Sequence, residues 1–394
     1  MNEITPNEKT STTQAKSQKK ANWLQWVMVL CFAGIGFLFA MLMIRIMDAA
    51  AANGATDGQV MLLWIGLMVS MYAVLFLHIV LHEGGHLIFG LLTGYRFVSF
   101  RVGSLMLLKN EQGYCLRWMR LGGTGGQCLL DPPEMVDGKM PNVLYNLGGC
   151  LMNLLVGVVC LMAAFLCPAN SVGRALLLLS AIVGVIYALI NGLPLAGEMA
   201  NDGRNALELN KNPEALNALR IQLVINKLNS QGVRLKDMPE EYFVWPSEES
   251  RQSSLIAAVA VLCANRLLDE HRFDECAARL DEMLDGDMEK LPGMYRKLLL
   301  VDRVFLHLLN DETETAVTLM NREQKQFMKT MKGQLLIHRT DYAYALLAEK
   351  DITMAEKQLK TFDKVAKNYP HPQEVEAERE LIALVQAAHH EKNG

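Results

Sequence analysis

The stretch Val60–Leu92, VMLLWIGLMVSMYAVLFLHIVLHEGGHLIFGLL, decides how the rest of the chain folds. It contains no lysine, arginine or aspartate, and Glu83 is its one carboxylate. Because about 20 apolar helical residues cross the hydrocarbon core of a bilayer, the stretch predicts a membrane-spanning helix. An unpaired charge inside such a helix costs roughly 2.5 to 3.5 kcal/mol, so the cluster of His82, Glu83 and His86 needs polar partners or a metal ion.

Three more apolar runs are long enough to span a membrane, and the sequence therefore predicts four transmembrane helices. The first of them is longer than the apolar core of a signal peptide, which has about 7 to 15 residues, and no small-residue cleavage site follows it. We interpret this run as a retained span. The three runs are Trp23–Met47, Val143–Leu166 and Val172–Leu195.

The composition of the whole chain predicts two unlike parts. Of its 394 residues 51% are hydrophobic and 20% are charged, which is too apolar for a typical soluble protein and too charged for a purely membrane-embedded one. A formal net charge of -4 leaves no basic excess, which argues against nucleic acid as a partner. The eight cysteines form no C-x-x-C pair, so we expect no disulfide framework.

Basic residues of the short loops predict the orientation in the membrane, since cytoplasmic flanks carry the excess of lysine and arginine. Four lysines lie in residues 1–22, and six lysines and arginines lie between the second and third predicted spans. The link after the first span and the link Pro168–Ser171 carry no basic residue. We expect a multi-pass protein of the cell membrane with both termini cytoplasmic and with residues 1–22 as a disordered tail.

The loop between the second and third spans has β-forming composition. Phe97–Leu108 and Tyr114–Leu121 are rich in β-branched, aromatic and aliphatic residues and flank the turn Lys109–Gly113. This pattern predicts a β-hairpin over residues 97–121. The following Gly122–Gly126 lacks the GK[ST] ending of a phosphate-binding loop and is interpreted as a flexible loop.

After residue 205 the composition is typical of a soluble helical domain, with apolar residues at helical spacing. Ala277, Ala316 and Ala355 recur at intervals of 39 residues, each near the start of a predicted second helix. Small residues at matching points permit close packing, as in tetratricopeptide-like arrays, whose usual period is about 34 residues. An ordinary helical bundle is the alternative, and Gln373–His389 is a terminal capping helix under either interpretation.

The predicted fold class is therefore an all-α membrane protein. It has four transmembrane helices, a β-hairpin in the cytoplasmic loop and a soluble α-helical repeat-like domain. The expected divisions are the tail 1–22, a first transmembrane helix 23–47, a membrane core 60–205 and a cytoplasmic helical tetratricopeptide-like domain 206–394.

The histidine pair in the second span has the spacing of a metal site. His82-Glu83-Gly84-Gly85-His86 is an HExxH arrangement, and four-residue spacing places both imidazoles on one face of a helix. Two neutral imidazole nitrogens bind Zn²⁺, while Glu83 is suited to take a proton from the attacking water. The alternative is a pair of hydrogen-bonded histidines in a polar membrane cavity. His78, one turn earlier, is expected to support the site or to pack.

Together these residues resemble a known family, the site-2 proteases, which are intramembrane zinc metalloproteases. The resemblance covers about residues 60–205. In that family a small residue follows the HExxH helix, a glycine-rich element with an asparagine lies on the next span, and an N-x-x-P segment leads to an Asp-Gly pair. The matching elements here are His82–His86 with Gly90, then Gly148-Gly149 with Asn153, and then Asn191, Pro194 and Asp202-Gly203.

The resemblance implies roles for residues after the fourth span. It makes Asp202 the third zinc ligand, although three extra residues between Pro194 and Asp202 leave Glu198 as a rival. It also implies that Asn153 and Asn191 position the substrate backbone or the hydrolytic water. Interhelical hydrogen bonding is the alternative role of the two asparagines.

Two functions of different class follow from these patterns. The first is an intramembrane zinc endopeptidase that hydrolyses peptide bonds in transmembrane segments of membrane-anchored substrates, in regulated intramembrane proteolysis or in signal-peptide clearance. The alternative is a membrane-anchored helical-repeat scaffold with a structural or vestigial zinc site, which has no use for Glu83. Expected partners are a membrane-spanning protein or peptide substrate and a protein regulator at the C-terminal helical domain.

Overall fold

The computed structural model describes residues 6–119, 125–195, 200–285 and 293–393. The chain divides into two compact units. Unit 1 consists of Met1–Thr93 and Pro141–Lys211, and unit 2 consists of Gly94–Met140 and Asn212–Gly394. The central loop therefore belongs to the same compact unit as the C-terminal helices.

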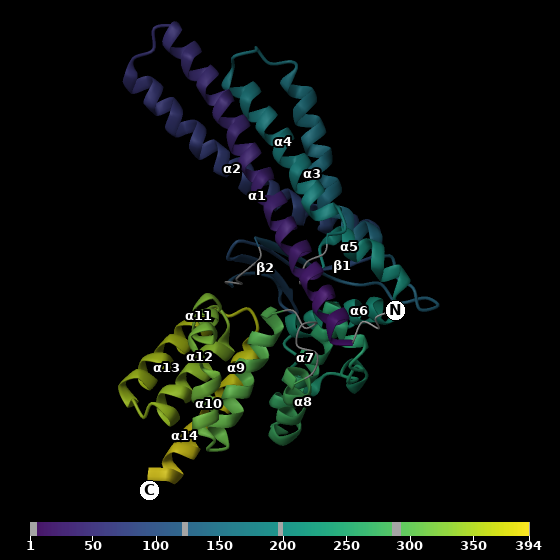
Figure 1. Ribbon diagram of the computed structural model, residues 1–394, viewed down its shortest axis with the longest axis vertical. Helices are drawn as coiled ribbons and strands as arrows, with labels where there is room; N and C mark the ends of the chain where they lie inside the picture. The colour runs from purple at the N-terminus through teal and green to yellow at the C-terminus, as the bar shows by residue number, and fades with distance from the viewer. Residues whose placement is uncertain (1–5, 120–124, 196–199, 286–292, 394) are drawn as a thin grey trace. The chain divides into compact units, whose positions relative to one another are not determined.

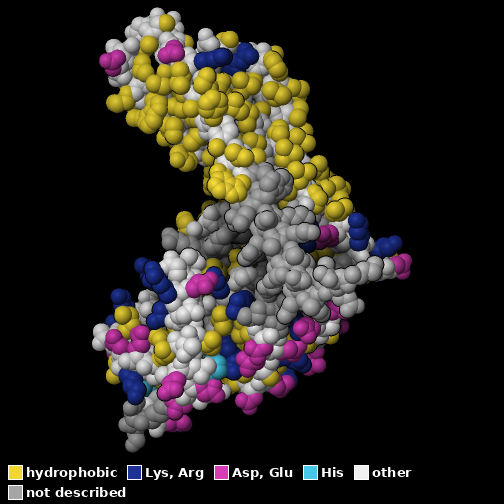
Figure 2. Space-filling view, in the orientation of Figure 1, with side chains coloured by type: hydrophobic (Ala, Val, Ile, Leu, Met, Phe, Trp, Pro, Cys, Tyr) yellow, Lys and Arg dark blue, Asp and Glu magenta, His cyan; other side chains and the backbone are white. Residues whose placement is uncertain are grey.

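Unit 1 is built from long helices that run side by side (Figure 1). Four stretches have the length and apolar composition of membrane spans, with mean hydropathies of 2.2 to 2.4, which confirms the prediction of four apolar helices. Many of their large hydrophobic side chains are exposed, and they cover these helices in Figure 2. The helices are α1 Pro6–Ala52, of which Val29–Ala52 is the candidate span, α2 Asp57–Leu92, α3 Val143–Ala164, α4 Val172–Gly192 and the short α5 Asp202–Glu208, followed by the 3-10 turn η1 Leu209–Lys211.

Polar side chains determine where two of the spans begin. Thr56 and Gln59 form a capping box at the start of α2, in which each side chain bonds to the backbone N–H of the other residue. Ser171 accepts a hydrogen bond from the Arg174 N–H at the start of α4. These caps satisfy N–H groups that have no partner inside the helix. These caps fix the starts of α2 and α4, so the link from α1 to α2 and the link from α3 to α4 are short.

The sheet of unit 2 is larger than the hairpin that the sequence predicted. It has four antiparallel strands in the order β3-β2-β1-β4, and the predicted turn after Lys109 does connect two of them. The segment predicted as one strand contains a further turn at Gly103, whose φ of 59° is in the left-handed region. The strands are β1 Arg96–Val102, β2 Leu105–Asn110, β3 Gly113–Trp118 and β4 Gly126–Asp131.

The fourth strand lies at the far side of β1. It pairs from Arg96↔Asp131 to Val102↔Gly126, with an irregularity between Phe97 and Ser99. The sequence analysis did not predict β4, because its partner is not adjacent in the chain. Most of the glycine-rich loop that precedes it lies outside the described residues, as does the end of the predicted second strand.

The rest of unit 2 is helical. A π-helical segment, η5, continues the helix before it, and several short 3-10 turns connect the longer elements. The elements are α6 Pro213–Ser230, η2 Leu235–Asp237, η3 Glu240–Tyr242, η4 Ser250–Gln252, α7 Ser254–Asp269, α8 Phe273–Asp285, α9 Gly293–Leu309, α10 Thr313–Leu319, α11 Arg322–Thr330, α12 Leu335–Ala343, η5 Tyr344–Ala348, α13 Ile352–Ala366 and α14 Pro372–Asn393.

Three helix pairs of unit 2 share the same turn. His271, Asp311 and Lys350 have φ values of 57°, 64° and 54°, and each stands two residues after one helix and two residues before the next. A left-handed residue reverses the chain direction after a helix. The three helical hairpins therefore repeat in backbone conformation as well as in sequence, while the tetratricopeptide assignment stays a prediction.

The turns also identify the equivalent core positions. Ala316 and Ala355 each lie five residues after the left-handed residue, and both are buried in the core of unit 2. In the first pair this position is Cys276, whose side chain is also buried, and the Ala277 of the predicted alignment is only partly buried. The first helix pair therefore also has a small buried residue at this position, but it is Cys276 and not Ala277. The spacing from this residue to Ala316 is one residue longer than the 39 of the predicted alignment.

We expect the turn between η5 and α13 to respond to substitution at Lys350. A left-handed conformation costs a non-glycine residue roughly 1 to 2 kcal/mol, so Lys350→Gly should stabilise the chain by up to about 1 kcal/mol after the loss of backbone entropy. Lys350→Val should destabilise it, because a branched side chain tolerates positive φ poorly. Thermal unfolding in detergent, followed by circular dichroism, measures both. A Lys350→Gly protein less stable than Lys350→Val would contradict the turn geometry.

Candidate metal centre

Three predicted ligand side chains converge in unit 1. The Nε2 atoms of His82 and His86 lie 3.1 Å apart. The Oδ2 atom of Asp202 lies 3.1 Å from His82 Nε2 and 3.5 Å from His86 Nε2. Among the described residues they form the group of histidine and carboxylate side chains that could hold a metal ion.

The spacing of these atoms fits zinc. Tetrahedral Zn²⁺ with ligand distances of about 2.0 to 2.1 Å separates its ligand atoms by roughly 3.3 Å. The three separations between the ligand atoms are 3.1, 3.1 and 3.5 Å. Two imidazoles and one carboxylate leave the fourth position for water or substrate, as in catalytic zinc sites. The residues present therefore fit a zinc ion.

Both imidazoles are held through their second nitrogen. The Nδ1 atom of His86 lies 2.7 Å from the carbonyl oxygen of Tyr145, which can only accept, so Nδ1 carries the proton and Nε2 presents a lone pair. The Nδ1 atom of His82 lies 3.2 Å from the side-chain amide of Asn153. Such contacts orient a metal-binding imidazole.

Behind His82 a chain of polar side chains runs into the apolar helices. Asn153 Oδ1 lies 3.0 Å from His78 Nδ1, and His78 Nε2 lies 2.9 Å from Ser180 Oγ. Asn153 and His78 are both fully buried. Hydrocarbon offers no water to polar groups, so each member of this chain depends on its neighbours for hydrogen bonds.

Glycines bring the helices close enough to build the centre. A Cβ atom on Gly149 of α3 would stand 2.5 Å from Cε1 of His82, so only glycine leaves room for that imidazole. A Cβ atom on Gly148 would stand 2.6 Å from the carbonyl oxygen of Gly85 in α2. The glycine-rich element that carried the family resemblance therefore lies at the contact between α2 and α3. Gly90 is buried near the end of α2.

The N-terminus of α5 presents Asp202. Asn201 is the N-cap of α5, and its amide nitrogen donates to the carbonyl oxygens of Ile190 and Leu193 at 2.9 and 2.6 Å. A Cβ atom on Gly203 would clash with the backbone of Gly192 at the end of α4. These two contacts anchor α5 to α4. Glu198 lies outside the described residues.

Sequence reasoning did not find Asn201. The sequence signal that could have identified it is an asparagine directly before an acidic residue and a helix, which is typical of an N-cap. Its side-chain oxygen accepts from the Arg204 N–H at 3.1 Å. The N-cap places Asp202 in the first turn of α5.

The electrostatics favour the ionised form of Asp202. Burial alone would raise the pKa of its carboxyl, but the adjacent His82 and His86 outweigh burial and lower that pKa well below its usual range. The Cys150 thiol also donates to Oδ2 at 3.8 Å. Glu83, the remaining residue of the motif, is buried on α2.

Asn191, the second residue predicted to position the substrate, has its hydrogen bond outside this network. The Asn191 amide donates to the Tyr187 carbonyl oxygen at 3.0 Å, one turn back in the same helix. Such a bond inside a helix does not fix the side chain to another span.

Comparison with known proteins places the chain in a family. The model of peptidase family M50 matches residues 70–375, which include the HExxH motif, Asp202 and most of the helices of unit 2. No curated protein and no solved structure matches the chain. Because the matched residues make up more than half of the sequence, the chain belongs to peptidase family M50, the site-2 protease family, whose members are membrane metallopeptidases.

Proposed function

We propose that the protein is an intramembrane zinc endopeptidase that hydrolyses peptide bonds in transmembrane segments of membrane-anchored substrates. The observation that carries this proposal is the convergence of His82, His86 and Asp202 at the separation that tetrahedral zinc requires, on helices apolar enough to span a membrane. The processes that we propose for this protein are regulated intramembrane proteolysis or the clearance of signal peptides.

Each residue of the centre has a proposed role. His82, His86 and Asp202 bind the metal, and Glu83 takes a proton from the attacking water and passes it to the leaving amine. When bound, zinc acidifies water and polarises the scissile carbonyl. The burial of Glu83 beside the ligand pair supports an enzyme over a scaffold, because a structural zinc site has no use for this carboxylate.

Asn153 has a proposed role that differs from the one implied by the family resemblance. It is buried between His82 and His78 and therefore has no surface for a substrate. The amide nitrogen of Asn153 lies next to His82 Nδ1 in the structure, and we propose that the amide is turned over when zinc is bound, so that Oδ1 accepts from the Nδ1–H of His82 and Nε2 presents its lone pair to the metal. We assign Asn153 as the residue that orients His82, and keep Asn191 as a substrate-positioning residue.

The sheet offers a surface for an unwound substrate. A helical substrate must unwind before attack, because its carbonyls are engaged in hydrogen bonds, and an extended segment can add to an exposed strand edge. β3 is the last strand in the order of the sheet. Its side chains Tyr114, Leu116 and Trp118 are 65%, 62% and 65% exposed. We propose that β3 pairs with the unwound segment and that this face contacts its apolar side chains.

The proposed location is the cell membrane, with both termini on the cytoplasmic side. The distribution of lysine and arginine supports this orientation. The cytoplasmic helical domain, from residue 206 on, would bind a segment of the substrate or a regulator and so raise the local concentration of the membrane-spanning part. Its repeated hairpins support a tetratricopeptide-like binding domain.

The zinc content of variants tests the ligand assignment. His82→Ala, His86→Ala and Asp202→Ala should lose zinc, because each removes one of three protein ligands, whereas Glu83→Gln should keep zinc and lose cleavage of a single-span substrate. Metal analysis of the purified proteins and a cleavage assay measure the two properties. If Asp202→Ala kept its zinc and Glu198→Ala lost it, Glu198 would be the third ligand. Wild-type cleavage by Glu83→Gln would exclude the mechanism.

Zinc affinity tests the role of Asn153. Asn153→Ala should weaken zinc binding about 10- to 100-fold, as the loss of a residue that orients a ligand does. Asn153→Asp should restore most of the affinity, because a carboxylate accepts the His82 N–H. Asn191→Ala should bind zinc normally and slow cleavage. Competition with a chelator measures affinity, and wild-type zinc affinity of Asn153→Ala together with slow cleavage would favour the substrate-positioning role.

Labelling of single cysteines tests the orientation. In a variant without native cysteines, residues Gly54→Cys and Ser171→Cys should react with an impermeant maleimide on intact cells, because their links carry no basic residue. Gln112→Cys and positions after Gly203 should react only after the cytoplasmic side is opened. External labelling of the C-terminal half would contradict the orientation with four spans.

A further inference from the structure

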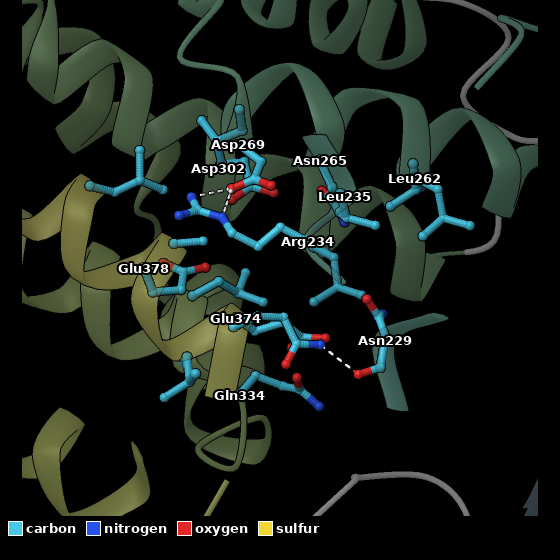
Figure 3. Close-up of a pocket in the computed structure, with 18 of the residues that line it drawn as sticks. Asn229, Arg234, Leu235, Leu262, Asn265, Asp269, Asp302, Gln334, Glu374 and Glu378 are labelled. Atoms are coloured by element: carbon cyan, nitrogen blue, oxygen red, sulfur yellow. Dashed lines mark hydrogen bonds and ion pairs between the residues drawn. The ribbon is translucent and has the colours of Figure 1, made fainter. Parts of the chain in front are cut away.

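Unit 2 contains a cavity of about 240 Å³ between its helices (Figure 3). Its lining residues come from the end of α6, the segment that follows it, and from α7, α9, α12 and α14. Pockets for drug-sized ligands measure about 300 to 1,000 Å³, so this cavity suits a smaller group such as one side chain. It shares no residue with the candidate metal centre.

The cavity holds more carboxylates than cations. Figure 3 shows Asp269 and Asp302 on one side of Arg234 and Glu374 and Glu378 on the other. Arg234 donates to Asp269 Oδ1 at 2.6 Å and to Glu380 Oε1 at 2.6 Å.

A second guanidinium, that of Arg339, contacts two further acids of the site. Arg339, which is fully buried, lies 2.5 Å from Asp302 and 3.2 Å from Glu378. The two arginines thus contact four carboxylates, counting Glu380 at the edge of the site, and the fifth, Glu374, is hydrogen-bonded by Tyr369.

The lining also offers unused acceptors. Gln373 is 5% exposed, and its amide nitrogen donates to the Asn229 carbonyl oxygen at 2.6 Å, which leaves Oε1 as the acceptor. Within the described part of the chain, neither Gln373 Oε1 nor Asn229 Oδ1 has a hydrogen-bond partner. Buried acceptors without a donor are costly, so the cavity suits a ligand that donates.

The titration of Glu378 agrees with this excess of negative charge. Burial is the largest cause that raises the pKa of Glu378 to about 7; the nearby Asp302, Glu374 and Asp269 contribute to the rise, and Arg339 opposes it. A cation in the cavity would favour the ionised form.

Much of the remaining wall is aliphatic, beside the polar Asn265, Gln334 and Tyr369. Its aliphatic residues include Val261, Leu262, Leu298, Leu336 and Leu381. Apolar walls together with acidic and amide acceptors fit an ammonium or guanidinium group on an alkyl stem, which is the chemistry of lysine and arginine.

We propose that this cavity binds a lysine or arginine side chain of a polypeptide. The proposal rests on the proposed function in one respect, namely that the polypeptide is the cytoplasmic flank of a membrane-spanning substrate. Such flanks carry an excess of lysine and arginine. The cavity then selects substrates by a basic residue beside the span, and the cleavage chemistry belongs to the metal centre alone.

Peptide binding to the full-length protein in detergent tests the proposal. The probe is a fluorescent alanine-rich peptide with one arginine, and its match has citrulline, which is isosteric and neutral, in place of arginine. The arginine peptide should bind about 10- to 100-fold more tightly, the range of a charged hydrogen-bonded contact. Equal binding of the two peptides would overturn the proposal. n-Butylguanidine, a free guanidinium with an alkyl stem, should compete weakly, and competition equal to that of the peptide would overturn the polypeptide assignment.

Variants locate the binding. Glu374→Gln should weaken the arginine peptide about tenfold or more, whereas Glu376→Gln, an exposed residue of the same helix outside the cavity, should not. Glu83→Gln should bind the peptide like the wild type, so failure of the protease assignment and failure of this proposal are distinguishable. Equal effects of Glu374→Gln and Glu376→Gln would overturn the assignment to this cavity.

Stability gives a readout that needs no peptide. Ala377 lines the cavity, so Ala377→Lys introduces an ammonium group among the carboxylates, and Ala377→Met introduces a neutral side chain of similar length. The lysine variant should melt at a higher temperature than the methionine variant and should no longer bind the arginine peptide. A lower melting temperature of the lysine variant would overturn the preference for a cation.

Discussion

Unit 1 depends on the close approach of two imidazoles of α2 and one carboxylate of α5. A helix with its side chains is about 10 to 12 Å across, so two packed helices normally keep their backbones well apart. Here the backbones meet at glycines. Gly149 leaves the volume that the His82 ring occupies, and Gly203 lets α5 rest on the backbone at the end of α4. Without both contacts, Asp202 and the histidines could not share one ion.

The polar chain behind His82 connects this centre to the packing of the spans. His78, Asn153 and Ser180 belong to α2, α3 and α4, so the hydrogen bonds that orient one ligand also join three helices. The α3 and α4 backbones approach closely at this depth, since a Cβ atom on Gly184 would stand 2.5 Å from the Asn153 carbonyl oxygen. In an apolar surrounding, these polar contacts hold the helices in one arrangement, because each broken bond would leave a group unsatisfied.

Unit 2 is stabilised mainly by an apolar core between its helical hairpins. Its hairpins bury a contiguous core that includes Phe305 and Phe362, and its helices carry the charged surface of a soluble protein. The family model extends over most of these helices, so they belong to the same family pattern as the metal centre. The acid-rich cavity holds five carboxylates against two arginines, and this excess of acids is the basis for the proposed binding function.

Much of the architecture could be predicted from the sequence because it depends on local patterns. The length of the apolar runs predicts the spans, and the four-residue spacing in His82–His86 predicts a shared helix face, since both follow from the geometry of one helix. The helical hairpins of unit 2 were predictable for the same reason. Of the contacts between distant segments, the meeting of Asp202 with the histidine pair was expected, and only from the family resemblance. Other such contacts were not predictable. The pairing of β4 with β1, the anchoring of α5 by Asn201 and the burial of Asn153 between two histidines appear only in the tertiary structure. Each depends on which backbones can approach one another. The packing between helices and strands decides this, and no local sequence pattern specifies that packing.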